Sequence, residues 1–181
     1  MSTYHHGDLR PALLRAAAKI LEKEGVGAVS LRELARRSGV SHNAPYRHFS
    51  DREGLLAALA EEGFALLARE LDGKPGSEMG VAYVRFALAY PQRFRLMFGG
   101  QLPLDQYPAL RKQARAACDD FEKTLSGLGA ATKFAAAAAW SLVHGLAHLL
   151  LDGHFTEVEK QTFIRKTLGA VRFALGAQRS A

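Results

Sequence analysis

The chain has 181 residues, of which 48% are hydrophobic and 23% are charged. That length suits one compact domain or a small module joined to a medium one, and the composition excludes an intrinsically disordered chain. The formal net charge of +6 points to a polyanionic partner. The charge is concentrated toward the N-terminus, because residues 1–52 hold nine Lys or Arg against five Asp or Glu.

Cysteine content and the N-terminal sequence bear on where the chain works. The single cysteine, Cys118, excludes an intramolecular disulfide and fits a reducing compartment. The first ten residues, MSTYHHGDLR, lack the apolar region of a signal peptide, so we expect a cytoplasmic protein. Residues 134–151 carry no formal charge, but they are rich in alanine and include two histidines. We therefore expect a buried helix there and no membrane partner.

Helical periodicity dominates the chain, because apolar residues recur at spacings of three and four nearly throughout. No sustained run of alternating apolar and polar residues is present, so no strand is expected. The pattern predicts an all-α protein with nine helices in two domains. The first begins near Leu9 and ends near residues 23–28, KEGVGA. The other approximate ranges are 31–38, 41–49, 51–72, 77–90, 91–98, 108–127, 131–151 and 156–176.

Two short helices around a glycine turn form the most informative local pattern. Ser30 and Glu33 have the S-x-x-E spacing of a capping box, and Gly39 suits the left-handed conformation of a sharp turn. Ser41 can cap the next segment, which gives residues 31–50 a helix-turn-helix arrangement. In that arrangement the second helix enters the DNA major groove. Arginines flank the two helices at positions 32, 36, 37, 47 and 52.

Pro45 lies inside the expected second helix. A proline in mid-helix costs about 3 kcal/mol, because it lacks an N–H and its ring meets the carbonyl four residues earlier. If Ser41 is the N-cap, the hydrogen bond lost at Pro45 is the one that would go to the Ser41 carbonyl. We expect that carbonyl to accept from water or phosphate donors instead. If Asn43 is the cap, Pro45 falls in the first turn at lower cost. The sequence leaves both registers open.

Residues 29–56, VSLRELARRSGVSHNAPYRHFSDREGLL, resemble the N-terminal module of the tetracycline-repressor (TetR) family of bacterial transcriptional regulators. Typical of the family are the L-x-E-L-A pattern, the Gly39-Val40 turn and the Y-x-H-F pattern followed by a polar cap and a basic residue. The stretches AYPQRFRLMF and WSLVHGLA look like a subgroup with a C-terminal Trp-x-x-x-His-Gly signature. The resemblance implies a DNA-binding domain at 8–68 and an effector-binding and dimerisation domain at 75–181.

The resemblance also implies roles for single residues in the first domain. The expected phosphate contacts are Ser30, Ser41, Tyr46 and Arg52, where family members more often have Lys at the last position. The residues expected to face the bases are His42, Asn43 and Ala44, and Asn43 has the chemistry to pair with adenine. The remaining DNA-contact candidates are Arg32, Arg36, Arg47 and His48.

Several of these residues have an alternative role in packing or solvation. Phe49 is expected in the core, and Tyr46 could also be a core residue. His48 also suits packing and backbone hydrogen bonding. Arg36 and Arg37 also suit a solvated helix face.

For the second domain the resemblance implies a pocket for a small-molecule effector that alters the separation of two DNA-binding modules. Aromatic and sulfur side chains at helical spacing are the candidate walls, although such sets also form plain core. The candidates are Tyr83, Phe86, Tyr90, Phe94, Met97, Phe98, Phe121, Trp140 and His144. An apolar effector with one polar group would suit an aromatic wall that His144 touches.

Two apolar stripes at heptad-like spacing predict a homodimer interface of two helices from each chain. The first stripe consists of Ala135, Ala139, Leu142, Leu146 and Leu149, and the second of Ile164, Leu168, Val171 and Leu175. A dimer would read a palindromic operator in double-stranded DNA, because the symmetry of the protein would match that of the site. We therefore expect a homodimeric transcriptional repressor.

Two other classes of protein remain as alternatives. His144 and His148 share a helix face and, with Asp152, could serve a helical metal hydrolase, but a general base and a well-spaced third ligand are lacking. We therefore expect no enzyme activity, no metal and no cofactor. The second alternative is a DNA-packaging protein without sequence preference.

Overall fold

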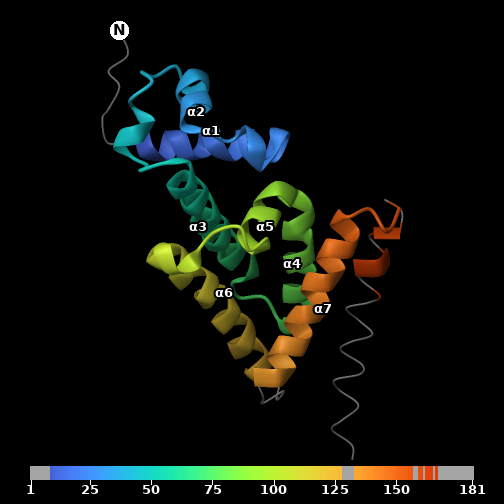
Figure 1. Ribbon diagram of the computed structural model, residues 1–181. Coiled ribbons are helices and arrows are strands. Elements are labelled where there is room, and N and C mark those ends of the chain that lie inside the picture. Colours follow the sequence, from blue (N-terminus) through green and yellow to red (C-terminus); the bar gives the residue numbers. More distant parts are fainter. Residues whose placement is uncertain (1–8, 128–132, 157–158, 161, 165, 167–181) are drawn as a thin grey trace, which may run out of the picture. The chain divides into compact units, whose positions relative to one another are not determined.

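The computed structural model describes residues 9–127, 133–156, 159–160, 162–164 and 166, and these residues confirm the all-α fold (Figure 1). The described α-helices are α1 (Leu9–Glu24), α2 (Leu31–Ser38), α3 (Arg52–Leu71), α4 (Gly76–Ala89), α5 (Pro91–Phe98), α6 (Pro108–Gly127) and α7 (Lys133–Leu151). Three short 3-10 helices are η1 (Val26–Ala28), η2 (Pro45–Arg47) and η3 (Leu104–Gln106). The described residues from 159 to 166 are also helical, and the rest of the expected last helix lies outside the described residues.

The chain divides into two compact units. Unit 1 combines Met1–Phe64 with Tyr90–Gln113, and unit 2 combines Ala65–Ala89 with Ala114–Ala181. Helices α3 and α6 each contribute residues to both units, whereas α5 belongs wholly to unit 1. This division follows from packing. The functional boundary between residues 68 and 75 stays a prediction.

Unit 1 is built on α1. One face of this helix is buried through Leu13, Leu14, Ala17, Ile20 and Leu21. α1 packs against η1, α2 and α5, and α2 contributes Leu31, Leu34 and Ala35 to the core. Each fully buried leucine or isoleucine stabilises the fold by about 1.5–3 kcal/mol.

Both ends of α2 have the predicted caps. The Ser30 hydroxyl accepts a hydrogen bond from the Glu33 N–H at 3.2 Å. At the other end, Gly39 has φ 64° and ψ 28°, a left-handed conformation that glycine adopts without steric cost. The Gly39 N–H bonds to the carbonyls of Ala35 and Arg36, which satisfies two carbonyls at the helix end.

α5 is joined to α1 through Glu22. The carboxylate of Glu22 accepts from the N–H groups of Gln92, at 3.2 Å, and of Arg93, at 3.0 Å. Pro91 occupies the first turn of α5, so Glu22 serves N–H groups that have no partner within the helix. The Arg93 side chain is 10% exposed, and its Nε lies 3.9 Å from Glu22. α3 approaches α5 closely, because a Cβ on Gly63 would lie 2.6 Å from the Met97 sulfur.

Unit 2 is organised around the packing of α4 on α7. Its buried side chains include Tyr83, Val84 and Ala87 on α4 and Val143, Ala147 and Leu150 on α7. Residues 72–75 separate α3 from α4, and Gly73 among them has φ 67°.

We predict that Glu22→Ala lowers the free energy of unfolding by about 2 kcal/mol, because two N–H groups lose their acceptor and the buried Arg93 loses its neighbouring carboxylate. Glu22→Gln should lose less, since the amide oxygen still accepts one hydrogen bond. Urea unfolding measures both changes. The control is Lys23→Ala, an exposed neighbour on α1 that should stay within about 0.5 kcal/mol of the parent. Equal stability of Glu22→Ala and the control would contradict the role of Glu22.

Candidate nucleic-acid interface

The segment that follows α2 differs from the sequence prediction. An α-helix is expected over 41–49, but the structure has tight turns and the short 3-10 helix η2. Pro45 is the physical reason. Because it has no N–H, the Ser41 carbonyl cannot accept an α-helical hydrogen bond from position 45, and it accepts from the Ala44 N–H at 2.9 Å.

Two expectations about this segment are therefore wrong. The Ser41 carbonyl has a backbone partner and does not depend on water or phosphate-bound donors. Neither Ser41 nor Asn43 is the cap of the short helix, because Ala44 precedes η2 and no side chain caps it. The chain then closes on itself, since the N–H groups of His48 and Phe49 both bond to the Pro45 carbonyl at 3.0 Å.

The turns present a polar and aromatic surface. The exposed residues are Ser41, His42, Asn43, Tyr46 and Arg47, and the half-buried ones are Ala44 and His48. The His42 and Tyr46 rings lie 5.7 Å apart between centroids, and His42 Nδ1 lies 3.4 Å from the Asn43 side-chain oxygen. The exposed group formed by His42, Asn43 and Tyr46 thus offers donors, acceptors and ring faces side by side.

Buried side chains support this exposed group from below. Pro45 is buried, and Phe49 is only 4% exposed, as the sequence predicts for a core residue. The Arg10 guanidinium lies over the Phe49 ring, 5.4 Å from its centroid, in a cation–π contact. η2 also packs against α2. The exposed group therefore stands on a fixed base.

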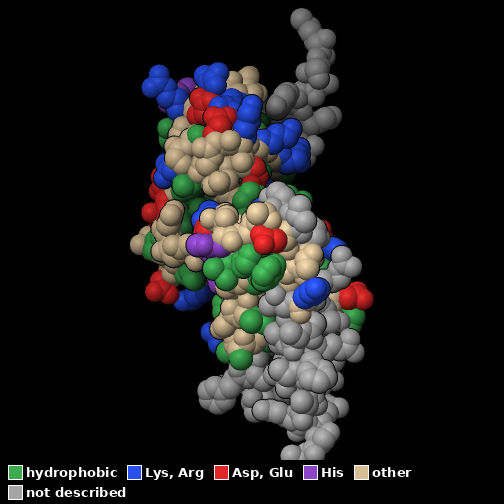
Figure 2. Space-filling model, turned by 90° about the vertical axis from the view of Figure 1, so that its right-hand side faces the viewer, with side chains coloured by type: hydrophobic (Ala, Val, Ile, Leu, Met, Phe, Trp, Pro, Cys, Tyr) green, Lys and Arg blue, Asp and Glu red, His purple; other side chains and the backbone are tan. Residues whose placement is uncertain are grey.

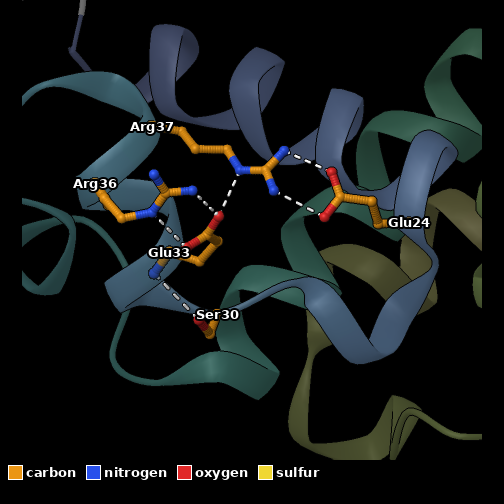
Figure 3. A network of polar contacts seen from close by, with 5 residues as sticks. All are labelled: Glu24, Ser30, Glu33, Arg36 and Arg37. Atoms are coloured by element: carbon orange, nitrogen blue, oxygen red, sulfur yellow. Dashed lines mark hydrogen bonds and ion pairs between the residues drawn. The ribbon is translucent and has the colours of Figure 1, made fainter.

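Arginines of α2 form a network with two carboxylates (Figure 3). Glu33 accepts from Arg36 at 2.6 and 2.9 Å and from Arg37 at 2.6 Å. Arg37 also reaches Glu24, at the end of α1, with hydrogen bonds of 2.6 and 2.7 Å. The hydrogen bonds from Arg36 and Arg37 lower the pKa of Glu33 to about 2, and the one from Arg37 lowers the pKa of Glu24. The network therefore stays ionised at neutral pH.

Sequence spacing accounts for the contacts of this network that lie within α2. Glu33 stands three and four residues before Arg36 and Arg37, and that spacing brings side chains together on a helix. The pairing of Arg37 with Glu24 joins residues thirteen positions apart and carries no local signal. Space-filling Figure 2 shows Asp and Glu among the Lys and Arg side chains at the upper end of the molecule.

Arg52 is held by backbone carbonyls. Its Nε donates to the Val29 carbonyl at 2.8 Å, and its Nη2 donates to the Val26 carbonyl at 2.7 Å. These bonds tie η1 to the start of α3. Lysine, which the family resemblance favours at this position, has no planar fork and could not make the same pair of bonds. Arg32 is exposed on α2.

Three candidate pocket residues of unit 2 meet at one hydroxyl group. The Trp140 Nε1–H donates to the Tyr83 oxygen at 3.2 Å, and the Tyr83 hydroxyl lies 2.9 Å from His144 Nδ1. Because indole only donates, the Tyr83 oxygen accepts there, and its hydrogen is suited to bond a neutral His144. Burial raises the pKa of Tyr83. Burial and then the nearby His148 lower the pKa of His144, which keeps its ring neutral.

The other pocket candidates lie in different places. Phe94 and Phe98 belong to unit 1, where their ring centroids are 4.9 Å apart and Phe64 stacks edge-on against Phe98 at 5.2 Å. Tyr90 and Met97 are in the same unit, and Phe86 is buried in unit 2. The Phe121 side chain lies outside the described residues. Two aromatic groups, one in each unit, thus stand where the sequence suggested one set.

The predicted dimer stripes are only partly exposed in the single chain. Leu149 is 45% exposed, Ala139 and Leu142 are half-buried, and Leu146 and Ile164 are buried. The side chains of the other stripe residues lie outside the described part of the chain. These residues are Ala135, Leu168, Val171 and Leu175. Leu146 and Ile164 therefore pack inside their own chain.

Two further properties concern the described residues alone. No three His, Cys, Asp or Glu side chains among them gather closely enough to hold a metal ion. No helix of this part of the chain is both long and apolar enough to cross a membrane.

We predict that His144 makes folding sensitive to acid. A folded-state pKa below the ordinary value of about 6.5 means that the unfolded chain binds the proton first. The contribution is fully present above about pH 6.5 and is lost as the pH falls through the folded pKa. His144→Gln keeps an acceptor for Tyr83 without titrating, so its free energy of unfolding should fall less between pH 7.5 and 5. His154→Gln, at an exposed histidine, should behave like the parent, and the same pH dependence in His144→Gln would contradict the prediction.

Comparison with known proteins places both parts of the chain. Residues 13–59 match the family described as bacterial regulatory proteins, tetR family, and residues 77–171 match the tetracyclin repressor-like C-terminal domain. An uncharacterised HTH-type transcriptional regulator of Mycobacterium bovis is 41% identical over 63 residues, which is 34% of this chain and 33% of that protein. The Escherichia coli tetracycline repressor protein class C is 32% identical over 117 residues, or 61% of this chain and 53% of the repressor.

A solved structure agrees over a greater length. A protein with unknown function from Rhodococcus sp. RHA1 is 34% identical, with a TM-score of 0.74 over 91% of this chain and 98% of that one. The curated relatives are matched over only a third to a half of their length. The two family matches, however, cover the helix-turn-helix and more than half of the chain. The chain is therefore a member of the TetR family of DNA-binding transcriptional regulators.

Proposed function

We propose that this chain is a homodimeric repressor that binds a palindromic DNA operator and is released by a small apolar effector. The observation that carries the proposal is the exposed group of His42, Asn43 and Tyr46 on its buried base. Polar groups on a rigid support are what base recognition in the major groove requires. Repression is inferred from the likeness to the E. coli protein, whose name describes a repressor.

The proposed DNA contacts divide by chemistry. The proposed phosphate contacts are three hydroxyl groups and one cation, and they belong to Ser30, Ser41, Tyr46 and Arg52. The base-facing residues are His42, Asn43 and Ala44. Other contacts come from Arg32, Arg36, Arg47 and His48. Arg52 is already bonded through Nε and Nη2, so its Nη1 is the group that would meet a phosphate.

The proposed dimer interface includes the exposed face of α7. The exposed residues of this face are Ala137, Ala138, Ser141, Gly145 and Leu149. They carry no charge and are mostly small, which permits close approach of a second helix. A Cβ on Gly145 would meet no atom within 4 Å. Figure 2 shows a group of hydrophobic side chains on the face that it presents. Among the described residues of unit 2, the large exposed hydrophobic side chains are Leu149 and Phe163.

The proposed effector site is built around Tyr83, Trp140 and His144. Their rings and shared hydrogen bonds would suit an apolar molecule with one polar group. The E. coli relative is named for tetracycline, which supports a small-molecule effector for this chain without identifying it. As a regulator of bacterial genes the chain would work in the cytoplasm. TetR-family regulators are not enzymes, and the hydrolase alternative is therefore dropped.

The decisive test is DNA selection. Duplexes bound by the full chain are enriched from a random library, and the enriched duplex is compared with a scrambled one at physiological salt. We expect a palindrome that binds about a thousandfold tighter than the scrambled duplex or better. Equal affinity for both would overturn the repressor and favour DNA packaging without sequence preference.

We predict that Tyr46→Ala and Asn43→Ala change DNA binding in different ways. Loss of the phosphate contact of Tyr46 should weaken binding to all duplexes alike. Loss of a base contact of Asn43 should relax the preference at one base pair in each half-site, by about 1–3 kcal/mol. Fluorescence anisotropy against a panel of single-base variants separates the two patterns. A uniform loss in both variants would contradict the assignment.

We predict that Gly145→Leu weakens the dimer, because a large side chain would hold the second helix away. Sedimentation equilibrium should show more monomer at a given concentration. The matched control is Ala109→Leu, which enlarges an exposed residue at the start of α6 in unit 1. If Gly145→Leu dimerises as strongly as the control, this face of α7 is not the interface.

A further inference from the structure

Arg37 differs from the other arginines around the helix-turn-helix, because its whole guanidinium faces carboxylates (Figure 3). Its Nη1 and Nη2 meet the two oxygens of Glu24 at 2.6 and 2.7 Å, and its Nε meets Glu33 at 2.6 Å. The two-pronged contact with Glu24 fits the planar fork of arginine.

Arg36 has a different setting although it is the next residue. Its Nε and Nη2 bond to Glu33 within α2, and its side chain is 69% exposed. The Arg37 side chain is 33% exposed and its contact crosses from α2 to α1. Arg36 therefore points a cation toward solvent, whereas Arg37 joins two helices.

The contact of Arg37 fixes a direction as well as a distance. Glu24 is the last residue of α1, and Arg37 lies in the last turn of α2. Glu33 lies in the first turn of α2, where the Ser30 cap holds its N–H. The chain of contacts from Glu24 through Arg37 to Glu33 therefore ties both ends of α2 to the end of α1.

Electrostatic repulsion disfavours a move of the Arg37 guanidinium from Glu24 to a DNA phosphate. Glu24 and Glu33 balance the charges of Arg36 and Arg37, so the network is neutral as a whole. If Arg37 turned to a phosphate, the Glu24 carboxylate would lose its partner beside a polyanion, and like charges repel. The gain of one contact would be offset by that repulsion.

We propose that Arg37 is a positioning residue for DNA binding, which sets the orientation of α2 on α1 through Glu24 and makes no phosphate contact. This inference rests on the proposed DNA binding. The orientation of α2 matters because η2 packs against α2, and the exposed group of His42, Asn43 and Tyr46 follows directly in the chain. Glu24, an acidic residue in a basic region, is the partner that the function requires.

The experiment compares five variants of the full chain on the selected duplex. Arg37→Gln removes the charge, Arg37→Lys keeps the charge but not the fork, and Glu24→Gln removes the partner. The double variant Glu24→Gln/Arg37→Gln completes a mutant cycle. Arg36→Gln, at a proposed DNA contact, is the comparison variant, and it should lower the salt slope whereas the Arg37 variants should not. Affinity is measured by anisotropy across a range of salt concentrations, because each phosphate contact contributes about 0.9 to the slope of log K against log salt.

We expect Arg37→Lys, Arg37→Gln and Glu24→Gln to weaken binding by similar factors of about threefold or more, with the salt slope of the parent. The double variant should bind no more weakly than either single one, because all three disrupt one contact. A phosphate role would give a different pattern: Arg37→Lys would bind like the parent, and Arg37→Gln would lower the slope by about one. That pattern, or tighter binding by Glu24→Gln, would overturn the proposal.

Amide hydrogen exchange separates this proposal from the proposed function. Without DNA, α2 should exchange faster in Arg37→Lys and Glu24→Gln than in the parent, while α4 and α7 keep the parent rates. If the parent shows no sequence preference but these variants loosen α2, the repressor proposal fails and the contact between helices stands. Unchanged exchange in α2 would overturn the positioning role whatever the DNA result.

Discussion

The buried face of α1 is the constraint on which unit 1 depends. η1, α2 and α5 all pack on this helix, and its core side chains are almost completely shielded from water. Two acidic residues at the same end of α1 then direct its neighbours. Glu22 binds the first turn of α5, and Glu24 binds the last turn of α2. The apolar face supplies the stability, and these carboxylates select the geometry, because hydrogen bonds are directional whereas apolar contacts are not.

Much of the fold could be predicted from the sequence, since it depends on neighbours in the chain. The Ser30 cap, the left-handed Gly39 and the inward residues of α2 are local features, and the structure has all of them. The contacts of Glu22 and of Glu24 join residues far apart in sequence, and no local pattern indicates them. The α-helix expected over 41–49 is absent for a local reason. The loss of the N–H at Pro45 turned the segment into a 3-10 geometry, although tolerance near a helix start was expected.

The candidate site could be predicted as a set of residues but less well as an arrangement. Family resemblance named the residues from Ser41 to Tyr46, and most of them are exposed, as a DNA contact needs. Composition alone would count every arginine nearby as a phosphate ligand. The structure distinguishes them, because the whole guanidinium of Arg37 is bound to carboxylates, whereas carbonyls hold only Nε and Nη2 of Arg52. In the second domain, spacing suggested one aromatic set, whereas packing assigns its members to two units.

α5 has a consequence for how such a chain can be recombined. Its sequence falls within the part matched by the C-terminal family, at residues 77–171, yet it packs on the helix that carries the DNA-binding module. A cut at the linker of residues 72–75 would therefore separate Glu22 from the N–H groups of α5 and expose the face of α1 that α5 covers. An exchange of the DNA-binding module between this chain and another family member would have to preserve that shared surface. Segments that lie on opposite sides of the linker in the sequence thus share one packing surface in this chain.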